Sequence, residues 1–336
     1  MHIFQVTPTS YAREGVIGGG ERIALYIDQA IRAAAAESRL PLSTTLLALD
    51  APTAFGSGSD RYQGIVGKAW DARSVHGAEL IQRLRGADIV LVHQCLTEVG
   101  LFTAAHARLL GKPVFGSDAG AGESALLGVN PDAALVYDAV HAISRFGEAV
   151  FAGLPVPIHV IPGPVDSESY KPPARSTLRD PRSFLAVGRV LPHKGYERTI
   201  RALPDGCRLD IVGQHYDGAY LAFLRSCIGK KDIRFHADLD DAAVHAMFAS
   251  AGLFVHASTH VDYLGRVHEK PELLGLAPLE ALSTGLRAVV SDAGSLPELG
   301  ILPGCHVFHT EKELAALLRD AADGRLPEAE PAAMHA

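Results

Sequence analysis

Short apolar runs alternate with helical segments along most of this 336-residue chain. The first run, IFQVTPT at 3–9, precedes a glycine-bearing loop and then the segment 21–37, whose apolar residues recur with helical spacing. Near-continuous apolar strands that alternate with helices are typical of a parallel sheet covered on both faces. The sequence therefore predicts an α/β protein built on parallel sheets.

The alternation is interrupted once, by the segment 162–181, which holds five prolines and few apolar residues. Such a composition indicates a linker. Beyond it the alternation restarts with SFLAVG at 183–188. We expect two Rossmann-like domains, 1–164 and 165–322, with the ligand in a cleft between them, at the carboxyl ends of strands. The end, 323–336, is rich in Ala, Pro and Glu and is expected to fray.

Composition excludes several classes of protein. The net charge is −7 and no basic patch is evident, which argues against a nucleic-acid partner. The four cysteines form no C-x-x-C pair, so they indicate neither a zinc site nor a disulfide framework, and they fit a reduced cytoplasm. No apolar run is long enough for a transmembrane helix, and the first residues resemble a strand more than a signal peptide.

Two loops have the residues expected of phosphate sites. In AVGRVLPHKGYERTI, a strand is predicted to end at Gly188, so Arg189 and Lys194 lie on the loop before a helix. The arginine fork and the lysine point charge suit a phosphate pair, although isolated surface cations are more often only solvated. A glycine run, 18–20, precedes the first helix and offers a second anion site. It is not G-x-G-x-x-G, which disfavours a dinucleotide fold.

A third motif, KPELLGLAPLEALSTG at 270–285, places two glutamates around an apolar turn. Pro278 fits the first turn of a new helix, so we expect Glu272 on a loop and Glu280 on that first turn. The N–H groups of 275–277 would then form an anion cradle between two carboxylates, which accept hydrogen bonds from sugar hydroxyls. The motif suits a sugar–diphosphate–ribose ligand.

Other interpretations of single motifs stay open. Paired carboxylates also occur in glycosidases, but that reading leaves the two cations and the glycine loops unexplained. Asp118, at a predicted strand end, is equally common as a turn or cap residue. Three histidines, His256, His260 and His268, are expected to be polar loop residues and not metal ligands.

With these motifs, the sequence resembles the retaining, nucleotide-sugar-dependent glycosyltransferases of family 4, which have the GT-B fold of two Rossmann-like domains. VGRVLPHKG resembles that family's Arg–Lys phosphate loop, and PELLGLAPLEALSTGLRAVVSDAGSLPEL resembles its two-glutamate signature. IPGPVDSESYKP is similar to its interdomain linker and GGGER to its N-terminal glycine loop. The resemblance extends over nearly the whole chain.

The resemblance implies metal-independent sugar transfer with no cofactor other than the nucleoside-diphosphate-sugar donor. It implies that Arg189 and Lys194 neutralise the diphosphate, that Glu272 contacts the donor sugar and that Glu280 holds the ribose. The departing phosphate then helps to take the acceptor proton, which retains the anomeric configuration. Further donor contacts are implied for Gly19, Gly20, Ala237, Leu239, Leu276 and Ala277.

The acceptor is expected on the N-terminal half. That half holds 12 basic and 15 acidic residues up to position 164, without the basic excess of relatives that act on membrane lipids. A soluble small molecule or oligosaccharide is therefore the expected acceptor. Candidate acceptor contacts at strand ends and loops are Tyr11, Arg13, His93, Gln94 and Asp118.

One departure from the family pattern leaves the function open. Where the family usually has a histidine before a glycine, this chain has Ala119, with Asp118 beside it. Asp118 replaces the histidine, or the donor lacks an ordinary 6-hydroxyl, or the protein catalyses poorly. The missing histidine favours one alternative to a transferase, a catalytically impaired nucleotide-sugar-binding protein. A nucleotide-sugar epimerase on the same fold is a second alternative, which the two-glutamate motif and the linker fit less well.

Overall fold

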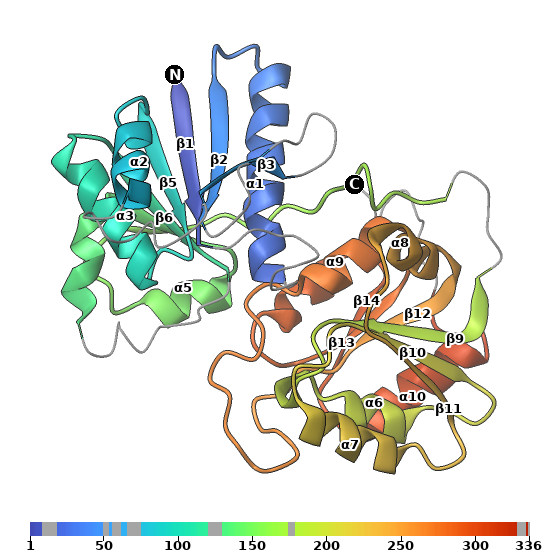
Figure 1. Cartoon of the computed structure of the whole chain (residues 1–336). Helices are drawn as coiled ribbons and strands as arrows, with labels where there is room; N and C mark the ends of the chain where they lie inside the picture. Colours follow the sequence, from blue (N-terminus) through green and yellow to red (C-terminus); the bar gives the residue numbers. More distant parts are fainter. Residues whose placement is uncertain are drawn as a thin grey trace. The chain divides into compact units, whose positions relative to one another are not determined.

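The computed structural model describes residues 1–8, 19–49, 54–55, 62–65, 75–119, 130–173, 179–327 and 334. The chain divides into two compact units, Met1–Pro164 and Val165–Ala336 (Figure 1). Each unit is built around its own sheet, in which neighbouring strands run parallel except for one antiparallel pair. None of the helices in the described ranges is both long and apolar enough to cross a bilayer.

The N-terminal sheet has the strand order β3-β4-β2-β1-β5-β6-β7-β8, and only β3 and β4 pair antiparallel. Its strands are β1 (His2–Thr7), β2 (Ser43–Leu49), β3 (Ala54–Phe55), β4 (Tyr62–Ile65), β5 (Ile89–His93), β6 (Val114–Asp118), β7 (Ala139–Ala142) and β8 (Ile158–Val160). The helical segments are α1 (Gly19–Glu37), α2 (Val75–Leu84), α3 (Glu98–Leu109), η1 (Pro131–Val136) and α5 (Arg145–Phe151).

Alternate residues of the N-terminal strands face two different environments. Phe4, Val6, Val90 and Val92 lie in an apolar core with residues of α2 and α3, because successive side chains of a strand point to opposite faces. Figure 1 shows α1 on the other face of this sheet. On that side, Gln5 of β1 is completely buried.

A hydrogen-bonded network joins α1 to β1 and β2. The side-chain amide of Gln5 donates to Asp28 Oδ1 at 2.7 Å and to Thr44 Oγ1 at 2.8 Å. Arg32 Nε donates to the other Asp28 oxygen at 2.8 Å. Buried polar groups need such partners, so this network fixes α1 against its two strands.

The C-terminal sheet is wholly parallel, with the order β11-β10-β9-β12-β13-β14. In chain order this is 3-2-1-4-5-6, the doubly wound Rossmann order, whose direction reverses between β9 and β12. The strands are β9 (Asp180–Val187), β10 (Arg208–Val212), β11 (Asp232–His236), β12 (Ala251–His256), β13 (Ala288–Ser291) and β14 (Cys305–Phe308).

Helices cover both faces of this second sheet, with α8 and α9 on one side and α6, α7 and α10 on the other (Figure 1). They are α6 (Tyr196–Ala202), α7 (Gly218–Cys227), α8 (Asp241–Ser250), α9 (Leu276–Ser283) and α10 (Glu311–Ala322), with the 3₁₀ segments η2 (Pro192–Lys194) and η3 (Leu296–Ile301). Asp217 and Thr310 cap α7 and α10 by accepting backbone N–H groups with their side chains.

The structure differs from several of the sequence-based expectations. Helix α1 begins at Gly19, so Gly19 and Gly20 form its first turn and are not on the preceding loop. Tyr170, in the proline-rich segment, is buried against His245 and Phe248 and so is packed into the C-terminal unit. Leu326, in the segment expected to fray, is buried and its carbonyl accepts from Arg287, so this residue is packed against the C-terminal unit.

A buried contact between α6 and α7 sets where α6 begins. The Tyr220 hydroxyl of α7 donates to Glu197 Oε2 at 2.6 Å and accepts the N–H of Tyr196 at 2.9 Å. Burial, followed by the charge of Glu197, raises the pKa of Tyr220, so the phenol stays protonated and remains a donor. The first residue of α6 is thereby fixed directly after the loop that carries Lys194.

Replacing Tyr220 with Phe is expected to lower the free energy of unfolding by about 1–3 kcal/mol, because it leaves a buried carboxylate and a backbone N–H without their partner. Urea unfolding of the two proteins measures the difference. Tyr216→Phe is the control, because Tyr216 is 49% exposed. Equal losses in the two variants would contradict this role of the Tyr220 hydroxyl.

Candidate functional site

The loops that follow β9 and β12 leave the C-terminal sheet at its switch point, where open α/β sheets bind ligands. Arg189 follows β9 closely and is half-buried, and it has no hydrogen-bond partner within the described part of the chain. Lys194 ends the short η2 segment of the same loop. Glu272 belongs to the loop after β12, as the sequence predicts. The switch point thus brings Arg189 and Lys194, which share one loop, to the same edge of the sheet as Glu272, 78 positions beyond Lys194 in the sequence.

A direct ion pair joins the two loops. Lys194 Nζ lies 2.6 Å from Glu272 Oε2, and the two side chains are only 12% and 15% exposed. His256, the last residue of β12, contacts the same oxygen through Nε2 at 2.7 Å. The prediction that His256 lies on a loop is wrong, because His256 is the last residue of a buried strand and is 7% exposed.

The electrostatics of this cluster keep Glu272 charged. Burial alone would raise the pKa of Glu272, but the charge of Lys194 and the hydrogen bond from His256 outweigh it and hold the pKa well below its ordinary value. Burial lowers the pKa of His256 despite the neighbouring carboxylate. Burial, followed by the charge of Lys194, lowers the pKa of His193 to about 3. The cluster therefore has one ammonium, one carboxylate and two neutral imidazoles near neutral pH.

Backbone contacts fix both loops. The N–H of Thr259 donates to the carbonyl of His193 at 2.8 Å, and the N–H of Ser295 donates to the carbonyl of Glu272 at 3.1 Å. Gly195 has a φ of 61°, and a Cβ there would lie 2.2 Å from the carbonyl oxygen of Ala257. The loop after β9 can approach the loop after β12 this closely only with glycine at 195.

The second glutamate of the motif, Glu280, is buried within α9 at 3% exposure. The helix begins at Leu276, two residues before Pro278, so Glu280 is the fifth helical residue and lies just past the predicted first turn. No side chain caps this helix, whose N-cap is Gly275. The first N–H groups of an α-helix lack partners within the helix, and those of Leu276 and Ala277 belong to this set.

The segment 237–239, for which the resemblance implies donor contacts, is held by a neighbouring loop. The side-chain amide of Gln214, which follows β10, donates to the carbonyl of Ala237 at 2.8 Å and to Asp238 Oδ1 at 3.2 Å. Leu239 is 37% exposed. Gln214 therefore fixes the turn after β11, although no sequence motif marks this residue.

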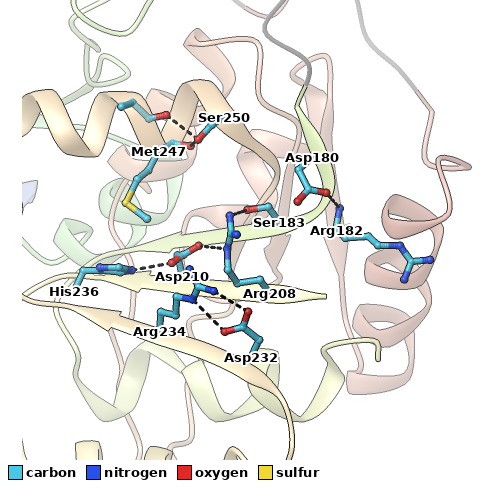
Figure 2. A network of polar contacts seen from close by, with 11 residues as sticks. Asp180, Arg182, Ser183, Arg208, Asp210, Asp232, Arg234, His236, Met247 and Ser250 are labelled. Carbon is cyan, nitrogen blue, oxygen red and sulfur yellow. Dashed lines mark hydrogen bonds and ion pairs between the residues drawn. The ribbon is translucent and has the colours of Figure 1, made fainter. Parts of the chain in front are cut away.

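A polar network anchors the end of β11 to the neighbouring strand β10 (Figure 2). Asp210 Oδ1 accepts from His236 Nε2 at 2.8 Å, and Asp210 Oδ2 accepts from Arg208 Nε at 2.9 Å. Arg208 also donates to Ser183 Oγ at 2.7 Å, which extends the network to β9. Since His236 directly precedes Ala237, this network sets the position of the turn after β11.

The N-terminal candidates lie at the carboxyl edge of their own sheet. His93 ends β5 and is 2% exposed, with Nε2 2.9 Å from Gln5 Oε1. Burial, followed by the charge of His141, lowers the pKa of His93 to about 3, so its ring is neutral. Gln94 has a φ of 47°, an uncommon backbone conformation for a residue with a side chain. Asp118 ends β6 and is buried. Tyr11 and Arg13 lie outside the described residues.

The other two histidines considered as metal ligands, His260 and His268, form hydrogen bonds within the protein. His260 Nδ1 lies 3.0 Å from the carbonyl of His268, and His260 Nε2 accepts the N–H of Gly294. His268 Nε2 lies 3.0 Å from Asp262 Oδ2. Across the described ranges, no group of three or more His, Cys, Asp or Glu side chains is arranged to hold a metal ion.

Comparison with known proteins gives a family match for most of the C-terminal unit. Residues 172–322 match the family Glycosyl transferases group 1. A curated relative from Arabidopsis thaliana, one of the subunits of phosphatidylinositol N-acetylglucosaminyltransferase, is 26% identical over 188 residues. These cover 54% of this chain but only 40% of the relative, so the chain matches less than half of that protein's length.

Solved structures resemble the whole chain. HepE of Anabaena, in complex with UDP and glucose, has a TM-score of 0.66 at 18% identity and covers 100% of this chain and 97% of its own. Sucrose-phosphate synthase from Thermosynechococcus elongatus has a TM-score of 0.67 at 17% identity, with coverages of 97% and 92%. Starch synthase IV of Arabidopsis thaliana, bound to ADP and acarbose, has a TM-score of 0.67 at 12% identity, with coverages of 99% and 94%.

These likenesses confirm the predicted fold class, GT-B with two Rossmann-like domains. The match of residues 172–322 to the glycosyl transferases group 1 family is a likeness of the C-terminal unit alone.

Substituting Gly195 with Ala is expected to lower stability by more than the backbone strain of about 1–2 kcal/mol that a left-handed residue costs, because the new Cβ meets the Ala257 carbonyl. Gly229→Ala is a matched control, with a φ of 59° and no atom within 4 Å of the added Cβ. Urea unfolding compares the variants. If both lose the same stability, the close approach of the two loops is not what requires glycine.

Proposed function

We propose that this protein is a retaining glycosyltransferase that moves a sugar from a nucleoside-diphosphate sugar to a hydroxyl acceptor without a metal ion. The observation that carries the proposal is the position of these charges at the switch point of the C-terminal sheet. Arg189 and Lys194 lie on the loop after β9, and Lys194 forms an ion pair with Glu272 on the loop after β12. Two cations and a carboxylate suit a ligand that is anionic at one end and rich in hydroxyls at the other.

In this proposal, the diphosphate lies between the loop after β9 and the start of α9. Arg189 supplies a planar pair of donors, and Lys194 keeps two ammonium hydrogens beyond its bond to Glu272. The free N–H groups and the positive dipole end of α9 add to the attraction. These groups stabilise the charge that develops on the departing nucleoside diphosphate, so no metal ion is required for that purpose.

The two glutamates then hold the sugars on either side of the diphosphate. Glu272 accepts a hydrogen bond from a hydroxyl of the donor sugar, and Glu280 accepts from the ribose. The turn 237–239, fixed by Gln214, offers backbone groups to the base. HepE and starch synthase IV bear UDP and ADP in their structures, so proteins of this fold accommodate different bases.

Retention follows if the departing phosphate takes the proton of the acceptor hydroxyl as that hydroxyl attacks from the same face of the sugar. In this step the new glycosidic bond forms, the bond from the anomeric carbon to the phosphate oxygen breaks, and the proton passes to the phosphate. The protein supplies positioning and fixed charge rather than a nucleophile.

We assign the acceptor to the N-terminal unit, at the carboxyl edge of its sheet near His93, Gln94 and Asp118. The absence of a basic excess in the sequence of this half favours a small molecule or an oligosaccharide. Asp118 is buried at the end of β6, beside the position of the family's histidine, and we assign to it the contact with the donor sugar that this histidine makes in the family.

A second candidate function is nucleotide-sugar binding without turnover. It is favoured by one observation, namely that Ala119 stands where the family has its histidine. This candidate keeps every donor contact given above and loses only transfer. Release of nucleoside diphosphate in the presence of acceptors therefore distinguishes it from the enzyme.

Arg189→Ala and Lys194→Ala are each expected to lower turnover at least tenfold while the fold stays intact, because each removes one of the two cations that stabilise the leaving diphosphate. Release of nucleoside diphosphate measures turnover, and circular dichroism checks the fold. Arg189→Ala is the cleaner variant, because Lys194→Ala also removes a partner of Glu272. Lys230→Ala, on an exposed turn, is the control. Near-normal turnover in the Arg189 variant would rule out its role.

A further inference from the structure

His256 contacts Glu272, and none of the donor contacts proposed above involves His256. Its Nε2 lies 2.7 Å from Glu272 Oε2, inside the C-terminal unit. The Glu272 carboxylate is charged and can only accept, so the proton of the neutral imidazole lies on Nε2 and His256 donates. The hydrogen bond comes from a strand of the sheet, which is a more rigid base than a loop.

The imidazole ring is held from several sides. It stacks nearly parallel on Phe254, with ring centroids 6.2 Å apart and an angle of 15°. Ser258 Oγ lies 3.1 Å from Nε2, and the Ser258 carbonyl in turn accepts from Ser291 Oγ at 2.6 Å. With His256 and Ser258 both buried, this donor has a fixed position.

Both donors to Glu272 bind the same oxygen. Lys194 Nζ and His256 Nε2 each contact Oε2, and no residue in the described ranges hydrogen-bonds to Oε1. The side chain keeps 15% of its surface exposed. One oxygen is therefore occupied by the protein, and the other has its acceptor capacity left for a ligand.

We propose that His256 is a positioning residue for the donor sugar. It holds Oε2 of Glu272, so that Oε1 meets a sugar hydroxyl, and it keeps this bond when the diphosphate attracts Lys194. A neutral imidazole suits this task because a phosphate does not attract it as it attracts an ammonium. This inference rests on the proposed function, in which Glu272 contacts the donor sugar.

The test compares a nucleoside diphosphate with the corresponding nucleotide sugar, because only the second carries the sugar that Glu272 contacts. Calorimetry first finds which of UDP, GDP, ADP and dTDP binds the wild type, and then measures that diphosphate and its glucose form in each variant. His256→Leu is expected to leave the affinity for the diphosphate within about twofold. It is expected to weaken binding of the nucleotide sugar and to lower kcat/KM about tenfold or more.

Two further variants test whether an N–H at the position of His256 Nε2 is what binding of the nucleotide sugar requires. His256→Gln is expected to restore most of the lost affinity, because its terminal amide places an N–H close to the position of Nε2. His256→Asn, one methylene shorter, is not expected to restore it, and it replaces the Leu variant if melting shows that Leu at 256 does not fold. His159→Leu, on the exposed strand β8, is the control.

Equal weakening of diphosphate and nucleotide sugar in the His256 variants would indicate a merely structural role and overturn the proposal. Unchanged binding of the nucleotide sugar in the folded Leu or Asn variant would also overturn it. A wild type that binds none of the diphosphates or their sugars would overturn the proposed function itself, and this outcome differs from both of the others.

Discussion

The ion pair between Lys194 and Glu272 is the interaction on which the rest of the site depends. These residues are 78 positions apart in the sequence, yet their charged atoms lie 2.6 Å apart. Both are largely shielded from water, where opposite charges attract more strongly than at the surface. A buried ion pair is costly to break on one side, so each loop constrains the other.

The strand order brings the loops that carry Lys194 and Glu272 to the same edge of the sheet. Because β9 and β12 are neighbours in a parallel sheet, the loops that follow them leave from the same edge. Backbone contacts then bring the loops together, from Thr259 to His193 and from Ser295 to Glu272. The hydrogen bonds of Gln214 and the network around Asp210 fix the next turn along the same edge. The sheet thus supplies the alignment, and polar contacts between loops supply the final positions.

Much of the fold follows from local patterns in the sequence. The strands β1 and β9 and the helices α1 and α9 lie close to the ranges that the sequence predicts, because continuous apolar runs, helical spacing and the position of Pro278 are local signals. Predictions failed where tertiary packing outweighs local composition. Leu326 is buried although its segment is polar and proline-containing, and α1 extends back to include Gly19 and Gly20.

The chemistry of the site was predictable only in part. Arg189, Lys194, Glu272 and Glu280 are marked by motifs, but their roles toward a ligand remain predictions. His256 is 16 positions from Glu272 and has no motif, so only the fold reveals their contact. The pairing of Lys194 with Glu272 was missed for the same reason, since side-chain pairing across two loops leaves no periodic signal in the sequence.

If the proposed function is right, the C-terminal unit binds a nucleoside diphosphate at Arg189 and Lys194. The most direct measurement is the melting temperature of the protein and of Arg189→Ala with UDP, GDP, ADP and dTDP, because a ligand of the folded state raises that temperature. We expect at least one diphosphate to raise the melting temperature of the wild type and to raise that of the variant much less. An absence of any shift, or an equal shift in both proteins, would contradict it.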